Sequence, residues 1–125
     1  MEYPQLKDIQ FLCREKVNED FSYKFLKIAT RPLNWGGLKP SDAAINNFKG
    51  FIEDVDLSNV TESITLDADY PEGLLLEWQE PTTQKTVTVA FTDEKIVFEK
   101  QDETPAEFFS LSHGLSLLAH TSLKA

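Results

Sequence analysis

The chain has 125 residues and a formal net charge of −9, with 21 acidic and 12 basic side chains. Its 41% hydrophobic and 11% aromatic residues predict one globular domain over residues 1–125 and exclude a disordered chain. The single cysteine, Cys13, excludes an internal disulfide framework. The sequence shows neither a signal-peptide pattern nor an apolar run long enough to span a membrane. We therefore expect a cytoplasmic protein without a membrane span.

The first thirty residues predict helix. A first amphipathic helix is expected from about residue 5 to 19 because apolar residues recur at near-helical spacing. These residues are Leu6, Ile9, Cys13 and Val17. Residues 21–30 are ambiguous, since Phe21, Tyr23 and Phe25 alternate as in a strand, whereas Phe21, Phe25 and Ile28 share one helical face. A helical continuation is favoured.

A loop and a further helix follow. Residues 30–40 contain two prolines and the pair Gly36-Gly37, with Trp35 as the one large apolar residue, which predicts a loop. Ser41 is a suitable N-cap for a helix over about residues 41–54. The apolar stripe of this helix consists of Ile45, Phe48, Ile52 and Val55.

From Ser58 onward the hydrophobic period becomes two, which predicts strands. A short first strand is expected around Val60–Leu66, and residues 74–79, 86–92 and 96–99 predict three strands joined by turns of hairpin length. We expect Trp78, Val89, Phe91 and Phe98 to be buried against side chains of the helices. Those helical side chains are Phe48, Ile52, Phe108 and Leu115.

The sequence Thr104-Pro105-Ala106-Glu107 predicts a last helix, because it combines a capping box with proline at the first helical position. Its apolar stripe would run to Leu118. The predicted fold is therefore α+β. A single antiparallel sheet, a three-strand meander with the short first strand as a candidate fourth, is covered on one face by about three amphipathic helices.

The negative charge is segregated along the chain. Residues 1–50 hold eight basic and six acidic side chains, a net +2, whereas residues 51–125 hold four and fifteen, a net −11. Nine carboxylates and no basic residue lie between Lys49 and Lys85. Such a segment repels nucleic acid and anionic membrane and attracts basic protein surfaces. The candidate partner-binding residues are Asp54, Asp56, Glu62, Asp67, Asp69 and Glu72.

No motif predicts catalysis, a cofactor or a metal site. Cys13 could form a nucleophile–base pair with His113 or His120, but a small buried residue on a helix is the favoured interpretation. The calcium-loop spacing that begins at Asp54 fails at its glycine and at its final glutamate, and Gly36-Gly37 lacks the lysine and the spacing of a P-loop. We therefore expect a protein that is not an enzyme.

The middle of the chain holds a series of short motifs, namely Asn34-Trp35-Gly36-Gly37, Pro40-Ser41, Ala44, Pro71-x-Gly73 and Leu76-Glu77-Trp78. In these motifs the chain resembles a group of small uncharacterised proteins of bacteria and their mobile elements. The group typically has an Asn/Asp-Trp-Asp-Gly-Tyr-Gly loop, so Gly36 departs from it, and the loop is shorter here. The resemblance implies a bacterial or phage-like setting and carries no activity.

The function expected from these features is that of an acidic, non-enzymatic protein-binding module. It would be a stoichiometric inhibitor of the anti-defence (including anti-CRISPR), antitoxin or immunity type, directed at a basic protein that processes nucleic acid. Direct nucleic-acid binding is not expected. Two alternatives remain open: a ligand-binding protein or enzyme with a pocket near Trp35 and Trp78, and a structural subunit of a larger assembly.

Overall fold

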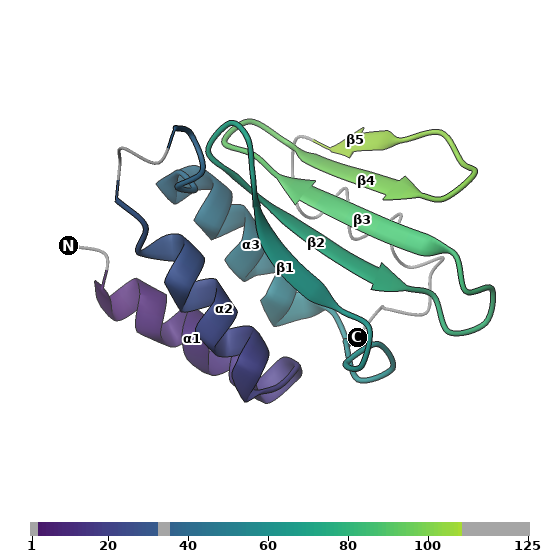
Figure 1. Cartoon of the computed structure of the whole chain (residues 1–125), viewed down its shortest axis with the longest axis horizontal. Helices are drawn as coiled ribbons and strands as arrows, with labels where there is room; N and C mark the ends of the chain where they lie inside the picture. Colours follow the sequence, from purple (N-terminus) through teal and green to yellow (C-terminus); the bar gives the residue numbers. More distant parts are fainter. Residues whose placement is uncertain (1–2, 33–35, 109–125) are drawn as a thin grey trace.

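The computed structural model describes residues 3–32 and 36–108 of the chain (Figure 1). Within them, helices α1 (Tyr3–Lys16), α2 (Glu19–Ala29) and α3 (Asp42–Asp54) precede all the strands. The strands are β1 (Thr65–Asp69), β2 (Gly73–Gln79), β3 (Thr86–Phe91), β4 (Ile96–Lys100) and β5 (Ala106–Phe108). They form one antiparallel sheet in the order β1-β2-β3-β4-β5, so the predicted α+β class is confirmed.

The first helix ends earlier than predicted, and a second, separate helix follows it. Asn18 adopts an extended backbone, and its side-chain oxygen accepts a hydrogen bond of 2.8 Å from the amide of Phe21, which caps α2. The chain reverses there, so that α1 and α2 pack side by side as a helical hairpin (Figure 1). Residues 21–30 are thus helical up to Ala29, as favoured.

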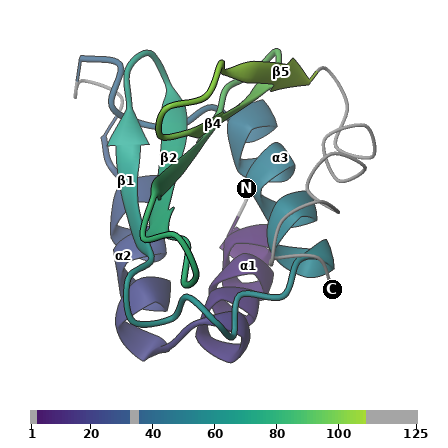
Figure 2. The same cartoon turned by 90° about the vertical axis from the view of Figure 1, so that its right-hand side faces the viewer.

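The third helix agrees with the prediction. Ser41 is its N-cap, and its hydroxyl accepts a hydrogen bond of 3.1 Å from the amide of Ala44. Phe48, Phe51 and Ile52 on its apolar side are fully buried. α3 packs on β2 and β3 while α2 packs on β1, so these helices cover one face of the sheet (Figure 2).

The first strand lies further along the chain than predicted. Val60 and Ile64 are buried, but they belong to successive turns in which the amides of Val60 and Ile64 bond to the carbonyls of Leu57 and Val60. The strand begins only at Thr65. Apolar residues four apart fit a turn as well as a strand, which is why the alternation misled the prediction.

The predicted last helix is wrong over the residues that the structure describes. Residues 106–108 form β5, which pairs antiparallel with β4, so that Val97 lies opposite Glu107. The capping box at Thr104 is a local preference, and it yields here to the backbone hydrogen bonds that the free edge of β4 offers. The remainder of that predicted helix, with Leu115, lies outside the described residues.

The core is an aromatic cluster between the sheet and α2–α3. The ring of Phe91 meets those of Phe48 and Phe51 edge-on at 5.5 and 5.4 Å, while Phe48 stacks on Phe25. The predicted burial of Trp78, Val89 and Phe91 is confirmed, whereas Phe98 is only partly buried. The side chain of Phe108 lies outside the described residues. Because these strand side chains all point to the helices, the alternate side chains form the opposite face, which none of the described helices covers.

Candidate protein-binding surface

The six predicted partner-binding carboxylates are spread over several elements and do not form one cluster. Asp54 ends α3, Asp56 and Glu62 lie between α3 and β1, Asp67 and Asp69 belong to β1, and Glu72 lies in the β1–β2 turn. All are exposed except Asp69, which is half-buried. The extended strand β1 separates Glu62 from Glu72 by roughly 17 Å of backbone, so no single small contact reaches both.

The corner around Asp56 is partly neutralised. Asp56 accepts a hydrogen bond of 3.0 Å from the amide of Ser58, and this bond is the main cause of its lowered pKa. Lys16 lies nearby, because its ammonium donates to the carbonyls of Glu53 and Val55 at the end of α3. A cation therefore offsets the carboxylates of this corner.

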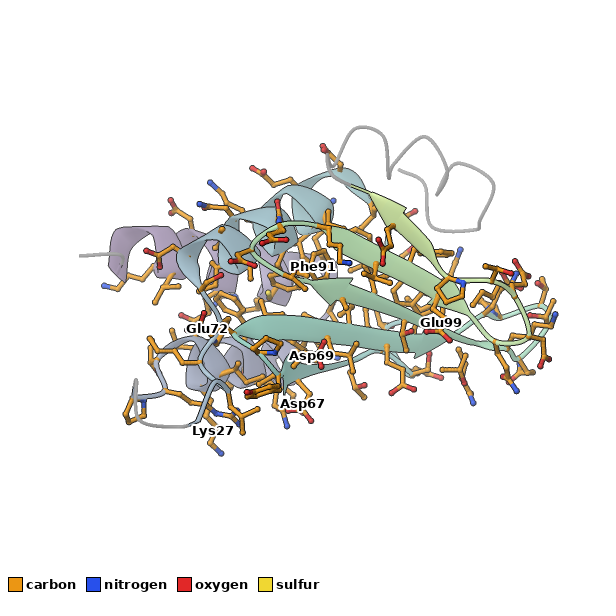
Figure 3. The ribbon with its side chains drawn as sticks, turned by 90° about the horizontal axis from the view of Figure 1, so that it is seen from above. Lys27, Asp67, Asp69, Glu72, Phe91 and Glu99 are labelled. Carbon is orange, nitrogen blue, oxygen red and sulfur yellow. The ribbon has the colours of Figure 1, made fainter. Side chains whose placement is uncertain are left out.

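Asp67 and Asp69 lie in β1, although the strand expected around Val60–Leu66 would have ended before both of them. They are two residues apart in β1, so both point away from the helices, whereas Phe91 points toward them (Figure 3). The Oδ1 of Asp67 accepts a hydrogen bond of 2.9 Å from the amide of Ala68. β1 is an edge strand, and this bond occupies one of its backbone donors.

The structure brings further carboxylates into line with β1 that the predicted set omitted. Across four strands, Thr65 pairs with Glu77, Glu77 with Thr88, and Thr88 with Glu99. Because adjacent strands are about 4.8 Å apart, the backbone positions of Glu77 and Glu99 lie about 10 Å apart, and both side chains stand on one face. The alternation within each strand predicts that Glu77 and Glu99 lie on the solvent face of the sheet. Only the pairing register between strands shows that they stand in one row, which we call the acidic row.

An apolar row lies beside this acidic row on the same face. Leu75 pairs with Ala90 and Ala90 with Val97, and all three are half-buried. Asp67 pairs with Leu75 at one end of the row, and Glu107 with Val97 at the other. We call this surface the open sheet face. It consists of Thr65, Asp67, Asp69, Leu75, Glu77, Gln79, Thr86, Thr88, Ala90, Val97, Glu99 and Glu107.

The open sheet face carries a nearly uncompensated negative charge. No strand position on it is basic, and Lys95, just before β4, pairs with Glu107 at 3.0 Å. Among the described residues, no ion pair joins Asp67, Glu77 or Glu99 to a basic side chain. The open sheet face therefore combines an apolar centre with a border of carboxylates, of which Glu107 is paired and Asp67, Glu77 and Glu99 are not paired within the described residues.

The glycine loop is locked to the β1–β2 turn. The carbonyl of Gly37 accepts from the amide of Glu72, and the amide of Ser41 donates to the carbonyl of Glu72 at 2.8 Å. Gly37 has φ of +85°, and a Cβ there would lie 2.8 Å from the ring of Tyr70. The ammonium of Lys39 donates a hydrogen bond of 2.8 Å to the carbonyl of Ala29, which ties the loop to the end of α2.

Of the side chains considered for catalysis or ligand binding, Cys13 and Trp78 lie in the described part of the chain, and both are buried in the core. Cys13 is fully buried, and burial raises the pKa of its thiol to about 12, which leaves it protonated and unsuited to nucleophilic attack. Trp78 is 2% exposed and packs on Phe51 in the core. Within residues 3–32 and 36–108, no three potential metal-ligating side chains gather. His113, His120 and Trp35 lie outside the described residues.

Comparison with protein-family models, with curated proteins and with solved structures gives no match to this chain. Among the described helices, none has the length and apolar character needed to cross a bilayer. The surface chemistry of the described residues is therefore the basis for a functional hypothesis.

Proposed function

We propose that this protein is a non-enzymatic binding module whose open sheet face engages a basic surface of another protein. The observation that carries the proposal is the apolar row Leu75–Ala90–Val97, which is bordered by the unpaired carboxylates of Asp67 and the Glu77–Glu99 row. The apolar row would supply the buried centre of the contact. The carboxylates would supply long-range attraction and select against acidic partners.

The class of partner that fits is a nucleic-acid-binding protein. Such proteins present lysine and arginine side chains to a regular array of phosphates. Carboxylates held at fixed spacing on a sheet offer the same groups an alternative array, so binding would exclude the nucleic acid. A stoichiometric inhibitor of the anti-defence, antitoxin or immunity type acts in this way, and the −11 net charge of residues 51–125 supports this class over direct nucleic-acid binding.

The test compares two double charge reversals that change the net charge equally. Asp67→Lys with Glu77→Lys alters the open sheet face, and Asp54→Lys with Asp56→Lys alters the corner that Lys16 partly neutralises. All four carboxylates are exposed, so neither variant disturbs the core. A partner captured from the native host with the wild-type protein is purified, and its association rate with each variant is measured by surface plasmon resonance at two salt concentrations.

We expect the open-face reversal to lower the association rate about tenfold or more at low salt, and the corner reversal to change it much less. The wild-type rate should fall steeply between 0.1 M and 1 M salt, because the screening length shrinks from about 10 Å to about 3 Å. Bound nucleic acid should be displaced from the partner. Salt-independent binding, or equal effects of the two reversals, would mean that the contact lies elsewhere.

A further inference from the structure

The helical hairpin exposes two aromatic side chains that lie close together. Phe11 of α1 is 53% exposed and Tyr23 of α2 is 58% exposed, and both line one surface hollow of about 290 Å³. The guanidinium of Arg14 lies over the ring of Phe11, 5.5 Å from its centroid. Large exposed aromatics beside a hollow are typical of a contact surface.

A second hollow continues the first along the hairpin. Its volume is about 490 Å³, Leu6 and Leu26 line it, and it shares Lys7 and Gln10 with the first hollow. We call the two together the hairpin groove. Because α1 and α2 run in opposite directions, Arg14 and Glu19 border the groove where the helices join, and Leu26 lies toward its other end.

The groove lies on a side of α2 that is separate from the sheet. Asp20 and Lys24 line a different hollow, together with residues of β1. Glu19, Tyr23 and Leu26, on another side of α2, line the hairpin groove. A contact at the groove therefore leaves the open sheet face free.

The charges select the occupant of the groove. Helices α1 and α2 carry five basic and four acidic side chains, so the hairpin is nearly neutral although the chain carries −9. A basic partner would be drawn to the acidic sheet, whereas a second copy, which also carries −9, would be repelled there. A second copy of this chain meets the least repulsion at the hairpin, where it also finds both signs of charge.

We propose that two copies of this chain pack hairpin to hairpin about a two-fold axis parallel to the helices. Such an axis places α1 of each copy on α2 of the other, with the joined ends of both hairpins at the same end of the contact. Arg14 of each copy then faces Glu19 of the second copy, and the aromatic side chains share the interface centre. A two-fold axis perpendicular to the helices would instead pack α1 of one copy on α1 of the other in opposite directions. Arg14 of each copy would then lie near Lys7 of the other copy, and these two side chains are both positively charged.

The dimer would direct its two open sheet faces outward, because the groove and the open sheet face belong to different sides of the molecule. This inference does not depend on the proposed function, since it concerns only the association of the chain with itself. If both hold, the dimer would offer two binding faces to its target.

The test measures self-association by sedimentation velocity on the full chain. The wild type should sediment as a dimer of twice the 14.2 kDa monomer mass, and Phe11→Asp should be a folded monomer. Arg14→Glu and Glu19→Arg should each raise the dimer dissociation constant about tenfold or more, because each leaves two like-charge contacts per dimer. A mixture of these two variants should restore the dimer, since both contacts are then complementary.

The matched control is Asp20→Arg, which places a cation in the same first turn of α2 but outside the groove. It should leave the dissociation constant unchanged, and circular dichroism verifies that each variant is folded. The inference is overturned by a wild type that stays monomeric at about 0.5 mM. A mixture of Arg14→Glu and Glu19→Arg that fails to associate, or an effect of Asp20→Arg equal to that of Glu19→Arg, overturns it as well.

Discussion

Removing the ammonium of Lys100 should destabilise the fold more than removing any exposed cation of the sheet. Lys100 of β4 lies on the helix-side face, and its Nζ donates to the Oε2 of Glu80 at 2.8 Å. The two side chains are only 18% and 10% exposed. The other carboxylate oxygen of Glu80 accepts from the hydroxyl of Thr83 at 2.6 Å, so this carboxylate also holds the β2–β3 connection.

The magnitude follows from the burial of the pair. Lys100→Met keeps the apolar stem but leaves the Glu80 carboxylate without its cation, which costs 3–5 kcal/mol for a fully buried pair. Because water reaches the edge of this pair, we expect about 2 kcal/mol. Lys95→Met is the control, since Lys95 forms a pair of similar length with Glu107 whose side chains are 34% and 50% exposed. That change should cost less than about 0.5 kcal/mol.

The pH dependence provides a second readout. The hydrogen bond from Lys100, followed by that from Thr83, lowers the pKa of Glu80. A carboxyl whose pKa is lower in the folded state stabilises the fold above its unfolded pKa of about 4.3, and this contribution is lost as the pH falls through the folded pKa. In Lys100→Met the buried carboxylate of Glu80 has no cation beside it, so protonation of Glu80 stabilises the folded variant. The stability gap between wild type and Lys100→Met should therefore narrow as the pH falls from 7 to about 3.

Urea unfolding at both pH values, followed by Trp fluorescence, measures these differences. Adding Glu80→Gln to Lys100→Met should recover most of the loss at pH 7, because the amide can still accept from Thr83 without a buried charge. Equal destabilisation by Lys100→Met and Lys95→Met, or a gap that does not change with pH, would refute this account of the pair.

Two further predictions concern the core. Phe91→Ala removes a fully buried ring that contacts Phe48 and Phe51, so it should destabilise the fold by about 3–5 kcal/mol and lower the melting temperature by about 10–20 °C. Thr88→Ala on the open sheet face is the control and should change the melting temperature little. Equal melting temperatures of the two variants would contradict the strand register. Cys13, with its pKa raised to about 12 by burial, should react with a thiol reagent only after unfolding, and rapid reaction of the native protein would show that it is not buried.

The elements that the sequence predicts well are those in which local and tertiary preferences agree. Ser41 caps α3 as its position before an apolar stripe indicates. The alternation of apolar and polar residues over 74–99 predicts β2, β3 and β4 correctly. The connections between these strands are so short that neighbouring strands can pair only antiparallel. The break at Asn18 was also readable, since Asn followed by Glu19 and Asp20 is a helix-start signal within the apolar periodicity.

The features that the sequence could not predict depend on distant parts of the chain. The capping box at Thr104 gives way to pairing with β4, whose free edge no local pattern records. The candidate site was placed by charge density along the sequence, which favours Asp54 and Asp56 equally with Asp67. Charge density does not include Lys16, which is far away in sequence yet lies at the end of α3. It also misses the alignment of Glu99 with Glu77, which depends on the register through β3.

The edge strand β1 decides how a partner can approach the acidic surface. A partner that added a strand to β1 would need the outward amides of that edge. The carboxylate of Asp67 already accepts from the amide of Ala68, so such a strand would have to displace this bond and insert beside a negative charge. A partner that docks on the open sheet face meets neither obstacle, because Leu75 and Glu77 present their side chains with all backbone pairing intact. The carboxylate of Asp67 thus disfavours the pairing of an added strand with β1. Because Asp67 also borders the apolar row, a partner of the proposed kind would make its contact through the open sheet face.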